Sequence, residues 1–456
     1  MLKKNDTLTI EIVDLTNLGF GVGRHAGQVV FVSDTVVGDI AEVKIIKVNK
    51  SYAVARLEKL ITPSKMRIDA RCQISGCKSC TYRLISYEDE LRLKCDSVRA
   101  AFRREGLSDV SVLDTLPSPA ECEYRNKAQY PIAKNKDGEY VIGFFAPKSH
   151  RVTEARRCPL APRVFGDILD LLARFFKDYD LSVYDETSGK GLLRHVYLRR
   201  GEVSGEILLT LVINGDSIPK ESELVHRVCE AFPDVVGILL NTNDKDTNVV
   251  LGDAYRTLYG RDHIFDTLAG VRLKIAAPAF YQVNRSAAEL LYARARELAA
   301  PKKSDLLLDL YCGAGSIGLS MAEDCRELIG IEIVESAVKC ATENAAANGI
   351  KNASFFVGDA ADCEKLLLRA EENLGKKISP DVIILDPPRS GCDEKLINYV
   401  ARLLPKRIVY VSCNPATLAR DARLFSSLGY SVGEVSTVDL FPMTGHVESV
   451  VCLTRE

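Results

Sequence analysis

Strand-like and helix-like segments alternate strictly from about residue 285 to residue 430, and this rhythm most limits how the chain can fold. Short apolar runs, such as 306–310 and 381–385, are each followed by a stretch with helical periodicity. Repetition of strand, helix and strand is typical of parallel sheets with helices on both faces. We therefore expect an α/β fold with a doubly wound, mostly parallel sheet, whose strands end at one shared edge.

Polar side chains stand at the ends of the successive strands that this rhythm predicts. In chain order they are Asp309, Glu332, Asp359, Asp386 and Cys413. In an open α/β sheet the ligand crevice lies at the carboxyl edge of the strands. Helix caps and turn formers could account for any one of the acids, but they explain five successive polar strand ends poorly. The pattern therefore indicates a ligand site.

The segment 306–322, LLLDLYCGAGSIGLSMA, reads as a buried strand, a glycine-rich turn and a helix. Gly313, Gly315 and Gly318 match the G-x-G-x-x-G spacing in the strand-to-helix context that this motif requires. Glycine lets the backbone approach a ligand closely and lets the helix pack tightly on the strand. The motif alone suits a dinucleotide or S-adenosylmethionine (SAM) equally.

Two other sequence features distinguish between a dinucleotide and SAM as the cofactor. An NAD-dependent enzyme would leave the Asp-Pro-Pro strand end at 386–388 and the thiol of Cys413 without a role. We therefore favour a SAM-dependent methyltransferase. In that fold Glu332 would bind the ribose diol and Asp359 would contact the adenine amino group.

The stretch IVYVSCNPAT at 408–417 places a cysteine between a buried strand and a helix. Asn414 is a favoured N-cap residue, and Pro415 is a favoured first helical residue. The positive end of the expected helix 415–426 should favour the thiolate of Cys413. Burial as a small apolar residue is the usual fate of a cytosolic cysteine and is the alternative. A position beside a methyl donor instead favours covalent catalysis.

A thiolate is needed where the methyl acceptor is a weak nucleophile, as C5 of uracil is. Addition of the thiolate to C6 makes C5 reactive, and a general base must then remove the C5 proton so that the enzyme is released. A base that is paired or stacked in RNA must also be turned out into the pocket. The thiol therefore indicates methylation of uracil in RNA.

Six sequence blocks carry a resemblance to a known family. AFYQVN, DLYCGAGSIGL, GIEIVESAV, DPPRSG, YVSCNPATLARD and FPMTGHVESV follow one another between residues 270 and 456. Together they resemble the signature blocks of the bacterial RNA uracil-5-methyltransferases, which use SAM to make 5-methyluridine in tRNA and rRNA.

The resemblance implies roles for individual residues. Cys413 would be the nucleophile, and Glu448 would be the base that removes the C5 proton. Asp386 would contact SAM and lie close to the target base. The other implied SAM contacts are Gln282, Tyr311 and Glu332, beside the glycine loop with Gly313 and Gly315 and the strand-end acid Asp359.

The first 60 residues contain short β-branched runs separated by glycine turns, which predict a small β-barrel. This segment resembles the OB-like TRAM domain that some RNA-modifying enzymes carry. We expect three domains: a TRAM-like, RNA-binding barrel at 1–60, a central α+β domain at 61–265, and the methyltransferase domain at 266–456. The helical stretch 86–104 could pack on the methyltransferase domain.

Three of the 14 cysteines are crowded in CQISGCKSC, as Cys72, Cys77 and Cys80, and Cys158 before a proline is the expected fourth ligand. Four thiolates suit structural zinc or a 4Fe–4S cluster, and the spacing does not separate the two. The resemblance favours the iron–sulfur cluster, because ribosomal-RNA members carry one here, although the first gap is one residue shorter than expected. Its role would be structural. Cys95 and Cys122 are the alternative fourth ligands.

The net charge of −2 indicates that RNA recognition relies on local patches. Basic runs lie at 147–157 and 189–200, and basic residues alternate with aromatic ones at 123–132 and 143–152. Such segments suit looped RNA, where unstacked bases find aromatic platforms. The expected RNA contacts are Arg125, Asn126, Lys127, Tyr130, Phe144, Phe145, Lys148 and His150.

The four cysteines together with a TRAM-like barrel favour 23S rRNA as the substrate. A tRNA substrate is the nearest alternative, and a non-catalytic ribosome-assembly factor is the alternative from another class. No apolar run reaches the roughly 20 residues of a membrane span, and the start lacks a signal peptide. We therefore expect a cytoplasmic, monomeric protein.

Overall fold

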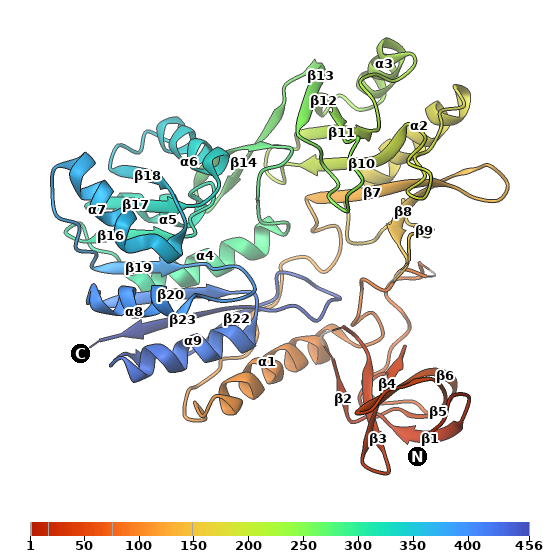
Figure 1. Cartoon of the computed structure of the whole chain (residues 1–456), viewed down its shortest axis with the longest axis horizontal. Helices are drawn as coiled ribbons and strands as arrows, with labels where there is room; N and C mark the ends of the chain where they lie inside the picture. The colour runs from red at the N-terminus through yellow and green to blue at the C-terminus, as the bar shows by residue number, and fades with distance from the viewer. Residues whose placement is uncertain (1, 17, 75, 148, 456) are drawn as a thin grey trace.

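The computed structural model describes residues 2–16, 18–74, 76–147 and 149–455. The N-terminal strands form a curled sheet with the order β1-β5-β6-β4-β3-β2 (Figure 1). Alternate residues of these strands, such as Val30, Val32, Val43 and Ile45, fill its interior. The strands are β1 (Thr7–Glu11), β2 (Asp14–Leu15), β3 (Gly21–His25), β4 (Gln28–Ser33), β5 (Ile40–Val48) and β6 (Tyr52–Thr62).

The central region contains a sheet with the order β13-β12-β11-β10-β7-β8-β9. Its strands are β7 (Lys127–Lys134), β8 (Tyr140–Phe145), β9 (Val152–Glu154), β10 (Leu193–Arg200), β11 (Ile207–Ile213), β12 (Val235–Thr242) and β13 (Ala254–Gly260). Helices α2 (Arg163–Asp178) and α3 (Glu221–Ala231) pack on one face through a shared apolar core that includes Phe165, Leu172, Val196 and Leu198. The other face therefore carries the alternate residues of each strand.

A hairpin of β14 (His263–Leu268) and β15 (Val271–Ala276) leads into the C-terminal sheet, whose order is β18-β17-β16-β19-β20-β23-β21, with β22 beside β23. The neighbouring pairs from β18 to β20 are parallel, and β23 returns antiparallel to β20. The strands are β16 (Leu306–Leu310), β17 (Glu327–Glu332), β18 (Ala353–Val357), β19 (Val382–Leu385), β20 (Arg407–Ser412), β21 (Ser431–Val432), β22 (Ser436–Val438) and β23 (Glu448–Thr454).

Helices cover both faces of this sheet (Figure 1). They are α4 (Arg285–Ala299), α5 (Ser316–Met321), α6 (Glu335–Ala347), α7 (Cys363–Leu374), α8 (Glu394–Arg402) and α9 (Pro415–Ser427). Alternate residues of β16 enter separate cores, Leu306, Leu308 and Leu310 on one face and Leu307 on the other. The expected doubly wound, mostly parallel sheet is confirmed.

Helix α1 (Tyr87–Arg104) lies beside α9 and contributes Cys95, Val98 and Phe102 to the core of the C-terminal sheet (Figure 1). Its buried Lys94 donates to the carboxylates of Glu90 and Asp439, both at 2.7 Å. Cys95 is buried in this core, whereas Cys80 and Cys158 pack in a different apolar cluster. In the described ranges, no helix combines the length and the apolar character that a membrane crossing requires.

Candidate active site

Asp309, Glu332, Asp386 and Cys413 lie at or directly beyond the carboxyl ends of β16, β17, β19 and β20, which are neighbours in the sheet. Glu448 lies at the same edge of the sheet, but it is the first residue of the antiparallel strand β23. Because Ser412 of β20 pairs with Ser449 of the antiparallel strand β23, Glu448 stands across from Cys413. The sheet therefore brings the expected nucleophile and base together from strands of opposite direction.

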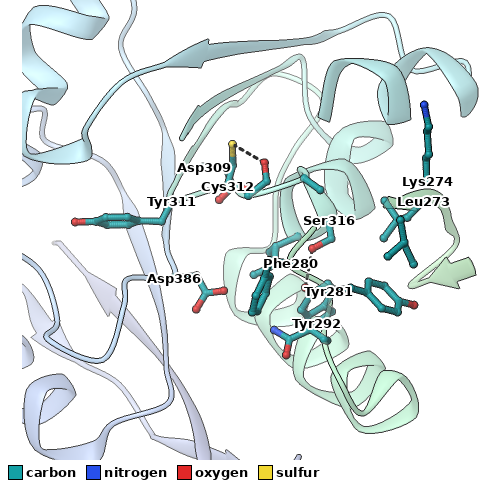
Figure 2. A pocket seen from close by; sticks show the side chains of 15 residues that line it. Leu273, Lys274, Phe280, Tyr281, Tyr292, Asp309, Tyr311, Cys312, Ser316 and Asp386 are labelled. Atoms are coloured by element: carbon teal, nitrogen blue, oxygen red, sulfur yellow. Dashed lines mark hydrogen bonds between the residues drawn. The ribbon is translucent and has the colours of Figure 1, made fainter. Parts of the chain in front are cut away.

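A cavity lies at this edge, beside the loop that joins β15 to α4. Its volume of about 40 Å³ is below the roughly 300–1,000 Å³ of a typical small-molecule site. Figure 2 shows the carboxylate of Asp386 directed toward Phe280 and Tyr292, whereas the Tyr311 ring extends away from them. The walls include the expected cofactor residues Gln282, Tyr311, Gly313 and Asp386, together with Lys274, Phe280, Tyr281, Tyr292, Asp309 and Ser316.

The acids of this edge share a poorly solvated environment. Burial raises the pKa of Asp386 to about 7. Burial, reinforced by Asp386, raises the pKa of Glu448 to about 8. Burial likewise raises the pKa of Asp309 to about 8, against the hydrogen bond from Gly318. Carboxyl groups in this state would be stabilised in their charged forms by a cation, such as the sulfonium of SAM.

The glycine loop is shaped around two of these carboxylates. The backbone N–H of Gly318 donates to Asp309 at 3.0 Å, and a β-carbon at Gly318 would lie 2.7 Å from the same oxygen. Gly315 precedes α5 with φ of +81°, in the left-handed region that favours glycine. Gly313 donates its N–H to Glu332 at 3.0 Å. Glycine is therefore required here by conformation and by close approach.

Glu332 and Asp359 have different surroundings. Glu332 accepts from the N–H groups of Gly313 and Val334, which hold its carboxylate at the end of β17. Asp359 is exposed and accepts from Ala361 at 2.9 Å, as the cap of a short helical turn at 360–362. It does not line the described cavity, so its contact with adenine stays a prediction.

The helix start beside Cys413 forms as expected. Asn414 caps α9 by accepting from Ala416 at 3.1 Å, and Pro415 is the first helical residue. The expected lowering of the Cys413 pKa is wrong for this site, because burial and the charges of Glu448 and Asp386 raise it. Arg389 opposes that shift through its charge and a hydrogen bond to the thiol.

Arg389 is a site residue that the sequence pattern does not reveal. It stands in the DPPRSG block, but only the fold shows that its guanidinium faces the thiol of Cys413. Its Nη2 lies 3.5 Å from Nε2 of His446, which precedes β23. Tyr292 was also missed; it is buried on α4 and hydrogen-bonds to Ser316 at 2.8 Å.

The four expected cluster cysteines lie close together. Cys72 and Cys80 are hydrogen-bonded, which together with burial raises the pKa of Cys80, and Cys77 and Cys158 add to the effect. Apolar side chains, Tyr124 and Leu160 among them, pack around Cys80 and Cys158. Among the described residues, however, no group of three or more His, Cys, Asp or Glu side chains stands in a metal-binding arrangement. Cys122 is exposed.

Several expected RNA contacts are wrong, because their side chains are turned into the protein; the amide of Asn126 donates to the carbonyl of Gln282 at 2.7 Å. Tyr130 is fully buried, Asn126 is buried, and Phe144 packs against the core beneath α2. In the second basic run, the guanidinium of Arg194 donates to the carbonyl oxygens of Asn243 and Lys245. Phe145 and His150 are exposed, whereas Lys148 lies outside the described residues.

Two family models match parts of the chain, and similar proteins match its whole length. The family described as tRNA (Uracil-5-)-methyltransferase matches residues 244–456, and the TRAM domain matches residues 2–57. An uncharacterized RNA methyltransferase of Clostridium acetobutylicum is 38% identical, over 100% of this chain and 98% of that protein. One of Bacillus cereus is also 38% identical, with the same coverage.

A solved structure is similar over the whole chain. It is the Pyrococcus abyssi tRNA (uracil-54, C5)-methyltransferase in complex with S-adenosyl-L-homocysteine, with 27% identity and a TM-score of 0.78. The match covers 98% of this chain and 100% of that chain. These similarities show that the chain belongs to the RNA uracil-5-methyltransferase family and is a SAM-dependent RNA methyltransferase with a TRAM domain.

Proposed function

We propose that this protein methylates C5 of a uridine in structured RNA, through a transient bond between Cys413 and C6 of the base. The observation that carries the proposal is the position of Cys413 between Glu448 and Asp386. Glu448 stands across from it on β23, and Asp386 lies between it and the cofactor cavity. The proposed nucleophile Cys413, the proposed base Glu448 and the methyl-donor site beside Asp386 therefore lie in one region, which we call the methyl-transfer corner.

The residues at the cavity fit SAM. Gln282, Tyr311 and Gly313 would hold it, with Glu332 behind the glycine loop, and the carboxylate of Asp386 would face its positive charge. SAM, when bound, supplies an electrophilic methyl group to this corner.

The side chains of the chain perform the remaining chemistry. The Cys413 thiol, which is only partly buried, must lose its proton to water, and the charge of Arg389 stabilises the resulting thiolate. The sulfur then adds to C6, and the electron pair of the C5–C6 double bond moves onto C5 and the O4 enolate. C5 forms a bond to the methyl carbon as the carbon–sulfur bond of the donor breaks, and the electron pair of that bond stays on the donor sulfur. The carboxylate of Glu448 next accepts the C5 proton, the double bond re-forms, and the sulfur leaves C6 with its electrons.

The substrate we propose is 23S rRNA, with a uridine of tRNA as the second candidate. The TRAM domain and the four clustered cysteines favour the ribosomal substrate, whereas the tRNA specificity of the similar P. abyssi enzyme favours the other. Mapping of 5-methyluridine in RNA from cells that lack the gene decides between them. The modification should disappear from 23S rRNA and remain in tRNA.

Cys413→Ser tests the chemistry. The variant should bind SAM as the wild type does, yet neither methylate RNA nor form an adduct with RNA that contains 5-fluorouridine. Cys122→Ser, which changes an exposed cysteine, is the matched control. Normal methylation by the Cys413→Ser variant would refute the mechanism. Absence of methylation by the wild type on every RNA would favour the non-catalytic assembly factor.

We also propose that Cys72, Cys77, Cys80 and Cys158 hold a 4Fe–4S cluster. Thiols of both segments lie near Cys80 in an apolar setting, which favours the proposal, although the described side chains are not in a metal-binding arrangement. The cluster would tie the 72–80 loop to the segment before α2 and would take no part in methyl transfer. Protein purified without oxygen should contain about four iron and four sulfide per chain, and Cys77→Ser should lose them while Cys122→Ser keeps them. One zinc per chain and no sulfide would refute the proposal.

A further inference from the structure

A second cavity, of about 750 Å³, lies at the start of β10, apart from the methyl-transfer corner. Its walls come from β7, β10, the 182–187 segment and the 246–248 loop, together with Phe145 and His150. This volume is within the range of sites that hold a nucleoside-sized ligand. Nothing in the proposed chemistry uses it.

An irregularity in β10 turns two successive residues into this cavity. The pairing of β10 with β11 shifts between Leu193 and His195, so Arg194 is an extra residue in the strand. Such bulges re-aim side chains and occur often beside functional sites. As a result, Arg194 and His195 both line the cavity, whereas Leu193 and Val196 face the core.

Both side chains are more than nine-tenths buried, with exposed fractions of 5% for Arg194 and 8% for His195, and both present an unused polar atom. Among the residues that the structure describes, Nε of Arg194 and Nδ1 of His195 have no hydrogen-bond partner. Burial, with the charge of Arg194, lowers the pKa of His195 to about 4, so its ring is neutral. A buried polar atom without a partner is costly, and a ligand would relieve that cost.

The rest of the cavity suits a flat, uncharged ring. The Arg194 guanidinium is fixed over the Tyr184 ring at 4.1 Å and is held by backbone carbonyl groups. Phe145, 40% exposed, stands edge-on to His195 with ring centroids 6.3 Å apart. The carboxylates of Asp185, Glu186 and Asp246 line the same cavity, and they would repel a phosphate but accept from the amino group of a base.

We propose that this cavity binds an unstacked nucleobase of the RNA substrate, which stacks on Phe145 and places its edge against Nε of Arg194 and Nδ1 of His195. The inference rests on the proposed function and adds to it a second point of RNA recognition. The proposed ligand is a base within an RNA chain, so binding of a free mononucleotide instead of RNA would overturn the proposal.

Strand β10 links this cavity to the methyl-transfer corner. Its far end carries Arg199, whose Nε donates to the carbonyl of Ala277 at 3.0 Å, just before the loop with Phe280 and Gln282. From His195 to Arg199 the strand extends about 13 Å. A few unstacked nucleotides span the length of this strand segment.

The test uses the full chain and total RNA from cells that lack the gene. Ultraviolet crosslinking followed by mass spectrometry of peptides should find a nucleotide on the peptide that contains Phe145. Phe145→Ala should raise KM for RNA about tenfold, the size expected for loss of one stacked base, and leave kcat and the affinity for SAM unchanged. Tyr259→Ala is the matched control, because Tyr259 is 42% exposed on the same sheet and its hydroxyl reaches Cys229 of α3 on the helix-covered face. It should behave as the wild type.

Several outcomes would overturn the proposal. One is crosslinks that occur only elsewhere in the chain, and another is equal KM values for the Phe145→Ala and Tyr259→Ala variants. A third is calorimetric binding of AMP, GMP, CMP or UMP that depends on Phe145 while RNA leaves no crosslink there. Because crosslinking needs no methylation, a wild type that crosslinks at Phe145 but methylates nothing would refute only the proposed function.

Discussion

The raised pKa values at the sheet edge predict that SAM binds more tightly as pH rises from 6 to 8. The carboxyl of Asp386 has its pKa raised from 3.8 to about 7 by burial. It is therefore mostly protonated at pH 6 and mostly ionised at pH 8. A bound sulfonium favours the ionised form, so binding at pH 6 must expel the proton.

The size of the effect follows from that pKa. With a pKa of about 7, roughly nine in ten Asp386 side chains are protonated at pH 6 and roughly one in ten at pH 8. If the cation requires the ionised form, the affinity rises about tenfold between these pH values, and binding at pH 6 releases about 0.9 proton. Any coupling to Asp309, whose pKa is raised to about 8, would steepen the dependence.

Titration calorimetry in buffers of different ionisation enthalpy measures both quantities. S-adenosylhomocysteine is the matched ligand, because it has the same amino and carboxyl groups without the positive sulfur, and its affinity should change less with pH. Asp386→Asn should weaken SAM binding and flatten its pH dependence. Equal SAM affinity at pH 6 and pH 8, or parallel curves for the two ligands, would refute the reasoning.

Two further predictions concern single side chains. Glu448→Gln should lower kcat by about 10²–10⁴-fold, because the C5 proton has no acceptor, and an RNA–protein adduct should accumulate on denaturing gels; an unchanged rate would contradict its role as the base. Lys94→Met should lower the free energy of unfolding in urea by about 3–5 kcal/mol, since it removes the lysine that the buried carboxylates of Glu90 and Asp439 share and leaves only Glu90 with another cation, Arg71. The exposed control Lys395→Met should change it by at most about 0.5 kcal/mol, and similar losses for both variants would contradict the importance of burial.

The local sequence pattern was sufficient to locate several residues of the candidate site. Asp309, Asp386 and Cys413 were located as strand ends, because apolar runs and glycine turns are determined by neighbouring residues. Glu448 could be assigned only by resemblance, since its place opposite Cys413 depends on the antiparallel return of β23. Arg389 was missed because its contact with Cys413 depends on the parallel pairing of β19 with β20.

The aromatic residues predicted to bind RNA show that the sequence pattern does not predict which side chains are exposed. Tyr130 and Phe144 lie in a segment of mixed basic and aromatic residues, yet they pack into the core, whereas neighbouring Phe145 faces outward. Alternation along a strand indicates that successive residues face opposite sides, but it does not say which side the helices cover.

By itself, the sequence determined the order of strands and helices, the glycine loop and the thiol at a helix start, because these depend on contacts a few residues apart. Only the tertiary structure decided which charges share the methyl-transfer corner, why burial raises the pKa of Cys413, and where the β10 bulge opens a second cavity. Those properties arise from low-dielectric surroundings built by strands and loops that are distant along the chain.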